Sequence, residues 1–133
     1  MKRIIPVLFL ALIITSNSFA QEAKDAYLAL KKIEASVQVG VKFNRYSELL
    51  ADAQFAMNLY LDKLRRSEEK LEKENDLMIA LKEPLDDYKK AKSTWGNILN
   101  SRNSEANNNY KEELQNLWSK ASKGLEEAGK LMK

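Results

Sequence analysis

Apolar residues recur along this chain at spacings of three and four, which is the period of an amphipathic α-helix. Four stretches show this pattern, and they span residues 22–38, 45–74, 76–100 and 110–132. No stretch shows the sustained alternation of a β-strand bounded by turns. Four amphipathic helices joined by short connections predict an all-α fold, an antiparallel four-helix bundle.

The ends of these helices carry local signals. Gly40 suits a left-handed C-cap after the first helix, and Asn44 is a candidate N-cap for the second. The Asn- and Ser-rich segment 101–109 predicts a linker between the last two helices, with Asn109 capping the fourth. Pro84 falls inside the third stretch, so it either kinks that helix or starts a new one.

The first twenty residues predict a cleaved signal peptide. Lys2 and Arg3 precede the apolar run Ile4–Ile14, and Ser18 and Ala20 place small residues before Gln21. This run is shorter than the roughly 18–20 residues that span a bilayer, so no stable membrane anchor is expected after cleavage. We therefore expect a periplasmic or secreted protein whose single helical domain covers residues 21–133.

Composition narrows the function classes. The whole chain contains no Cys and no His, which removes disulfides, thiol catalysis, His-based triads and the usual zinc ligands. Without the signal peptide, the chain has 20 basic and 19 acidic residues, so the domain lacks the excess of positive charge that nucleic-acid binding requires. We predict no catalytic residue, no metal and no cofactor.

Two charged residues fall on apolar helix faces. Glu34 lies between Tyr27 and Leu30 on a helical wheel, and Lys92 lies near the centre of its own stripe. A buried Glu34–Lys92 ion pair that fixes the register of the bundle would explain both. The alternatives are a catalytic lysine, which we disfavour, and a long side chain that reaches the bundle edge.

Phe55 and Leu59 lie on the far side of the second helix from its main apolar arc. They either contact a further helix, if the second helix is central, or form an exposed patch for dimerisation or a partner protein. We favour burial, because a domain of 113 residues without disulfides needs its large apolar groups in the core.

Five large side chains could line an apolar ligand pocket between helices. They are Met57, Tyr60, Tyr88, Trp95 and Trp118. Aromatic residues at helical spacing more often form plain core, so this pocket is the weaker interpretation.

The segment Val39–Leu61, with Tyr88 and Trp95 on the following helix, supports a resemblance. Its sequence VGVKFNRYSELLADAQFAMNLYL resembles a group of small exported all-helical bacterial proteins of unassigned function. The shared features are a Val-Gly corner and a Tyr-Ser-x-Leu-Leu helix start. The resemblance implies the fold and the export, and it implies no activity or site residue.

These observations favour a non-enzymatic, exported interaction module of the periplasm or cell envelope. Its partner would be an envelope protein or a second copy of the chain. The alternative is a bundle that binds a small apolar ligand, and an enzyme built on carboxylates and a lysine is the least favoured.

Overall fold

The computed structural model describes residues 18–67 and 72–132, and these residues form four α-helices and no strand. The helices are α2 (Ser18–Val39), α3 (Phe43–Arg66), α4 (Glu72–Asn100) and α5 (Ser104–Leu131). The predicted all-α four-helix bundle is confirmed. Most of the predicted signal peptide lies outside the described residues, and the predicted cleavage site after Ala20 falls in the first turn of α2.

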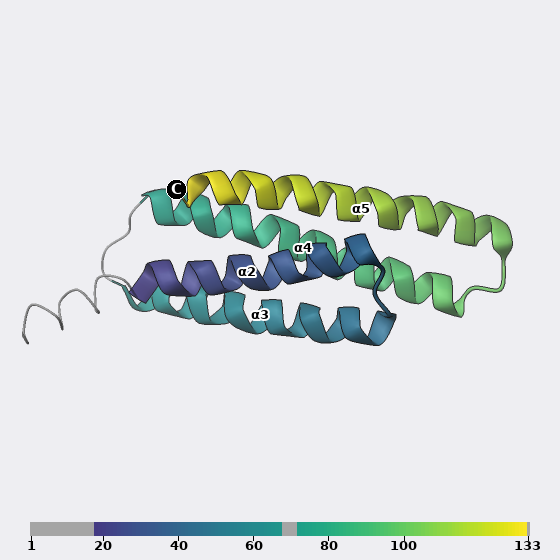
Figure 1. The fold of residues 1–133 in the computed structure, drawn as a ribbon, viewed down its shortest axis with the longest axis horizontal. Helices are drawn as coiled ribbons and strands as arrows, with labels where there is room; N and C mark the ends of the chain where they lie inside the picture. The colour runs from purple at the N-terminus through teal and green to yellow at the C-terminus, as the bar shows by residue number, and fades with distance from the viewer. Residues whose placement is uncertain (1–17, 68–71, 133) are drawn as a thin grey trace, which may run out of the picture.

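The chain folds as two helical hairpins that pack together (Figure 1). α2 packs along α3, and α4 packs along α5, while α3 and α4 join the two hairpins. The contact between α2 and α5 is thinner than either of the hairpin interfaces. In Figure 1 the α4–α5 hairpin also extends beyond the turn between α2 and α3.

Gly40 forms the turn between α2 and α3. Its φ of 91° lies in the left-handed region, and its N–H donates to the carbonyl of Val37 over 3.3 Å. The predicted glycine cap is therefore confirmed. The predicted N-cap at Asn44 is wrong, because Lys42 holds that position without a side-chain hydrogen bond and α3 begins at Phe43.

The helix α4 continues through Pro84, so Pro84 does not start a new helix. A proline inside a helix removes one backbone hydrogen bond. The Pro84 ring is buried and packs toward α5, where it lies 3.4 Å from the place a Cβ would take on Gly124. This packing offsets part of the cost of the lost hydrogen bond.

Two boundaries differ from those predicted. α5 begins at Ser104, because the Asn103 side chain accepts hydrogen bonds from the N–H groups of Glu105 (3.0 Å) and Ala106 (3.3 Å). Asn103 therefore takes the capping role predicted for Asn109, and the linker shortens from 101–109 to 101–103. α3 ends at Arg66, earlier than predicted.

The core draws residues from all four helices and contains one group of linked rings. We call this group the aromatic cluster; it consists of Phe43, Tyr46, Tyr88, Trp95 and Trp118. The ring centres of Tyr46 and Trp95 lie 5.5 Å apart, and those of Trp95 and Trp118 lie 5.7 Å apart. The Tyr46 hydroxyl donates to the Tyr88 carbonyl (2.8 Å) and accepts from the Trp118 indole (3.3 Å). The aromatic cluster thus joins α3, α4 and α5.

Candidate functional site

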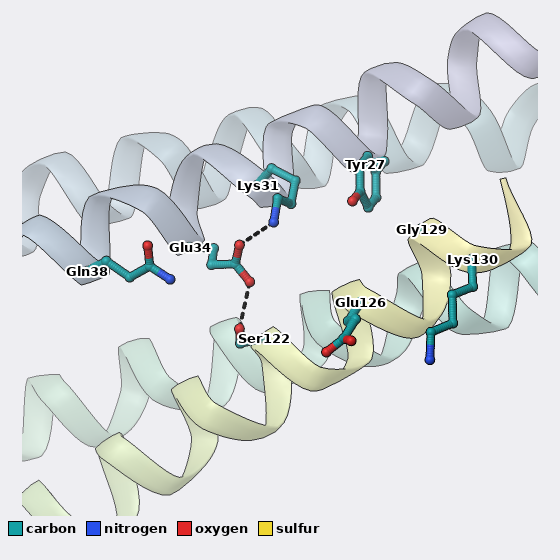
Figure 2. Close-up of a pocket in the computed structure, with 8 residues that line it drawn as sticks. All are labelled: Tyr27, Lys31, Glu34, Gln38, Ser122, Glu126, Gly129 and Lys130. Atoms are coloured by element: carbon teal, nitrogen blue, oxygen red, sulfur yellow. Dashed lines mark hydrogen bonds and ion pairs between the residues drawn. The ribbon is translucent and has the colours of Figure 1, made fainter. Parts of the chain in front are cut away.

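A groove of about 510 Å³ lies between α2 and α5 (Figure 2). We call it the α2–α5 groove; its lining residues are Tyr27, Lys31, Glu34, Gln38, Ser122, Glu126, Gly129 and Lys130. The first four come from α2 and the last four from α5. The groove therefore occupies the seam between α2 and α5, where the contact is thinner than in either hairpin interface.

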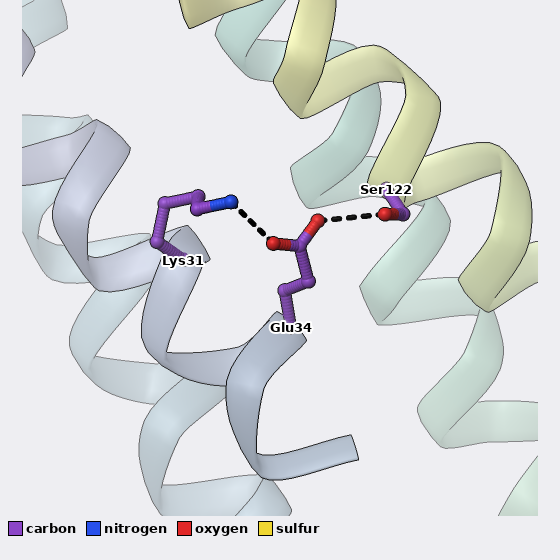
Figure 3. A network of polar contacts seen from close by, with 3 residues as sticks. All are labelled: Lys31, Glu34 and Ser122. Atoms are coloured by element: carbon purple, nitrogen blue, oxygen red, sulfur yellow. Dashed lines mark hydrogen bonds and ion pairs between the residues drawn. The ribbon is translucent and has the colours of Figure 1, made fainter. Parts of the chain in front are cut away.

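Glu34 forms a polar bridge across the groove (Figure 3). One carboxylate oxygen pairs with the ammonium of Lys31 on the same helix. The other accepts a hydrogen bond of 2.7 Å from the Ser122 hydroxyl on α5. The Glu34 side chain is 12% exposed, so the carboxylate is mostly withdrawn from water.

These contacts control the charge of Glu34. Burial acts to raise its pKa, but the hydrogen bonds from Lys31 and Ser122 and the charge of Lys31 outweigh burial, so the pKa lies below its ordinary value. The same hydrogen bond raises the pKa of Lys31. At neutral pH the groove therefore holds an ionised Lys31–Glu34 pair.

Tyr27 and Gly129 close one end of the groove (Figure 2). A Cβ added to Gly129 would lie 2.9 Å from the Tyr27 hydroxyl, closer than such atoms approach in proteins. The absence of a side chain at position 129 is therefore what lets the Tyr27 ring reach the surface of α5.

A second, smaller hollow continues the groove toward the aromatic cluster. It measures about 200 Å³ and shares Glu34, Gln38 and Ser122 with the larger one. Its remaining lining residues are Val37, Tyr88, Gln115, Trp118 and Ser119. Because they share these three residues, the two hollows adjoin each other along α2 and α5, and we call the pair the channel; its lining extends from Tyr27 to Trp118.

The predicted pairing of Glu34 needs correction, because Lys31 takes the place expected for Lys92. Lys92 is exposed on α4. The buried positions in that part of α4 are Ala91 and Thr94. Ala91 lies about 100° around the helix from Lys92, so the buried face of α4 has turned away from the lysine.

The five residues of the predicted apolar pocket do not meet in one place. Tyr60 donates a hydrogen bond of 2.7 Å to the Glu74 carboxylate, whereas Tyr88 contacts Tyr46. Tyr46 and Tyr60 are separated by 14 residues of α3, about 21 Å along the helix. Met57 is buried beside Tyr60 in the core of α3. Trp95 and Trp118 belong to the aromatic cluster at the other end.

Phe55 and Leu59 are exposed, at 66% and 43% respectively. They lie on the outer face of α3, opposite the buried positions Ala53 and Met57. The favoured expectation of burial is therefore wrong. α3 contacts both α2 and α4, but neither helix covers its outer face, which presents an i,i+4 apolar pair to solvent.

Sequence reasoning identified Glu34 but missed most of the groove. Tyr27 and Glu34 are seven residues apart on α2, as are Ser122 and Gly129 on α5. Residues at a spacing of seven lie on one side of a helix, beside the apolar stripe. Two helices that each carry polar or small residues at a spacing of seven beside the apolar stripe would have indicated this seam.

Other kinds of site find no support in the part of the chain that the structure describes. Within residues 18–67 and 72–132 there is no group of three or more His, Cys, Asp or Glu side chains placed to hold a metal ion. None of the described helices combines the length and the apolar content that crossing a membrane requires. Comparisons of the chain with protein-family models, curated proteins and solved structures found no match.

Proposed function

We propose that this chain is a non-enzymatic binding module that acts outside the cytoplasm, in the periplasm or cell envelope. Its N-terminal residues have the order of a signal peptide. Its sequence lacks Cys and His, the residues on which most nucleophilic and metal chemistry depends. An all-helical bundle with an unpaired outer face suits the binding of another macromolecule.

The observation that carries this proposal is the outer face of α3. Phe55 is 66% exposed and Leu59 is 43% exposed, one helical turn apart. Removing apolar surface from water stabilises an association by about 25 cal/mol per Å². Aromatic side chains are also enriched among the residues that dominate interface energies. A partner protein that covers Phe55 would therefore gain from the contact.

Site-specific photo-crosslinking in the producing cell tests this assignment. A photoreactive phenylalanine analogue replaces Phe55 in one variant and Leu28 in a matched control. Leu28 is 46% exposed but lies on α2. We expect a discrete adduct from position 55 and none from position 28. The mass of the adduct then separates an envelope protein from a second copy of the chain.

Equal or absent adducts from the two positions would contradict the proposed binding face. Export is tested separately by the intact mass of the protein recovered from the periplasm or medium. We expect a chain that begins at Gln21. A protein that retains residues 1–20, or that stays in the cytoplasm, would overturn the proposed location without affecting the crosslinking result.

A further inference from the structure

The α2–α5 groove has the size of a small-ligand site. Pockets that hold small molecules measure about 300–1,000 Å³, and the main hollow measures about 510 Å³. The adjoining hollow of about 200 Å³ lies toward Trp118. An ordinary seam between two bundle helices is filled by interdigitating side chains. This seam instead leaves open space on both sides of the Glu34–Ser122 bridge.

The charges of the groove cancel. Its lining includes two lysines, Lys31 and Lys130, and two glutamates, Glu34 and Glu126. Lys31 pairs with Glu34 inside the groove, whereas Lys130 pairs at 3.0 Å with Glu127, which lies outside the lining, so the balance rests on the equal number of lysines and glutamates that line the groove. A site for a phosphate, a carboxylate or an amine would present an excess of one sign. The lining therefore favours a neutral ligand.

The uncharged polar groups of the groove both donate and accept hydrogen bonds. Gln38 and Gln115 contribute amides, and Ser119 and Ser122 contribute hydroxyls. Each oxygen of the Glu34 carboxylate has one partner and keeps a second lone pair for a further donor. This set matches a ligand that carries several hydroxyl groups, because each hydroxyl also donates and accepts.

Aromatic side chains lie at both ends of the channel. Tyr27 lines the main hollow, and Trp118 lines the smaller one. Both are partly buried, so part of each side chain faces the channel or solvent. Apolar ring surface beside planar amides and a carboxylate is the combination that a pyranose requires. Its C–H face packs on a ring while its hydroxyls bind the polar groups.

A peptide ligand fits the groove less well. Peptides bind by adding a strand to a sheet edge or by laying the apolar face of a helix in an apolar groove. Proline-rich peptides dock in aromatic-lined grooves, and acidic peptides bind clusters of arginine. The described residues form no strand, and the lining is mixed and electrically balanced. We propose that the α2–α5 groove is a binding site for a neutral saccharide unit, separate from the outer face of α3.

The test uses the mature chain and a panel of neutral sugars: glucose, galactose, N-acetylglucosamine, maltose and cellobiose. Binding is followed by backbone amide shifts in NMR titrations and by tryptophan fluorescence. We expect at least one sugar to shift amides within residues 27–38 and 115–130 while leaving those around Phe55 unchanged. Glucose 6-phosphate and glucosamine should bind about tenfold more weakly than the best neutral sugar.

The matched variants are Gln115→Ala and Asn116→Ala. Both side chains are exposed on α5, but Gln115 lines the smaller hollow and Asn116 does not. We expect Gln115→Ala to weaken the bound sugar by about tenfold, the loss of one hydrogen bond, with no change in melting temperature. Asn116→Ala should leave both unchanged.

Three results would overturn the proposal. The first is the absence of groove shifts with every sugar in the panel. The second is tighter binding of the charged sugars than of the neutral ones. The third is binding of an end-blocked alanine tripeptide in the groove where no sugar binds, which would assign the site to neutral peptides.

Discussion

The aromatic cluster and the α2–α5 groove are neighbouring regions of the bundle in which facing helices are held together in different ways. In the aromatic cluster, rings from three helices meet at centre distances of 5.4–6.5 Å, mostly edge to face, and the Tyr46 hydroxyl makes two hydrogen bonds. In the groove, one hydrogen bond from Ser122 to Glu34 spans a space of about 510 Å³. The contrast teaches that one bundle can join its helices by direct ring packing in one region and by a single polar bridge beside open space in the next.

The largest expected effect comes from emptying the aromatic cluster. Tyr46 is fully buried and contacts three other rings, so Tyr46→Ala should lower the free energy of unfolding by about 3–5 kcal/mol. Tyr46→Phe keeps the ring and removes two hydrogen bonds, so it should cost about 1–2 kcal/mol. Urea unfolding measures both. A Tyr46→Ala loss no larger than that of a groove variant would break the comparison.

The next largest effect is expected from a substitution at Gly129, where the Tyr27 side chain approaches α5 closely. In Gly129→Ala the new Cβ would meet the Tyr27 hydroxyl at 2.9 Å, a steric cost of about 1–3 kcal/mol. The higher helix propensity of alanine offsets up to about 1 kcal/mol of this cost, so the free energy of unfolding should fall by about 1 kcal/mol. Gly96→Ala has nothing within 4 Å and should stabilise the protein. Thermal unfolding compares the two.

A double variant sharpens this result. Tyr27→Phe removes the hydroxyl that the new Cβ would meet, so it should restore most of the stability lost in Gly129→Ala. If Gly129→Ala proves as stabilising as Gly96→Ala, the Tyr27–Gly129 contact does not constrain the seam. The groove would then be held open by its polar bridge alone.

The periodic part of the fold was predictable because burial on a helix follows its turn. The stripe of Ala26, Leu30 and Ile33 is buried as its spacing indicates. The left-handed turn at Gly40 was predictable for the same local reason, since glycine alone adopts a positive φ without strain. Such features depend only on neighbours in the sequence.

Features that depend on where a neighbouring helix lies were not predictable. A wheel placed Lys92 on an apolar stripe, but α4 buries Asp87 and Thr94 instead, and Asp87 lies 3.5 Å from Lys120 of α5. The same wheel placed Glu34 correctly without identifying Ser122 as its partner, since that contact joins residues far apart in the chain. The burial expected for Phe55 was wrong because a helical wheel shows which residues share a face of a helix and does not show whether another helix covers that face.

The bridge across the groove predicts a dependence of stability on pH. The pKa of folded Glu34 lies below its ordinary value of 4.5, so its ionised contacts stabilise the fold above that pH. Stability is lost as the pH falls from about 4.5 through the lower folded pKa. Glu34→Gln should cost about 1 kcal/mol at pH 7 and flatten this part of the profile. Urea titrations from neutral to acid pH measure it, with Glu127→Gln, an exposed carboxylate, as the control.

The smallest change in the free energy of unfolding is expected on the outer face of α3, which belongs neither to the aromatic cluster nor to the α2–α5 groove. Phe55 is 66% exposed, so Phe55→Ala should change the free energy of unfolding by less than about 0.5 kcal/mol. Tyr60→Ala, five residues along the same helix and fully buried, should cost several times more. Chemical unfolding combined with sedimentation separates stability from association. A loss of several kcal/mol in the monomer would mean that Phe55 packs internally, and the outer face would no longer be a surface for binding.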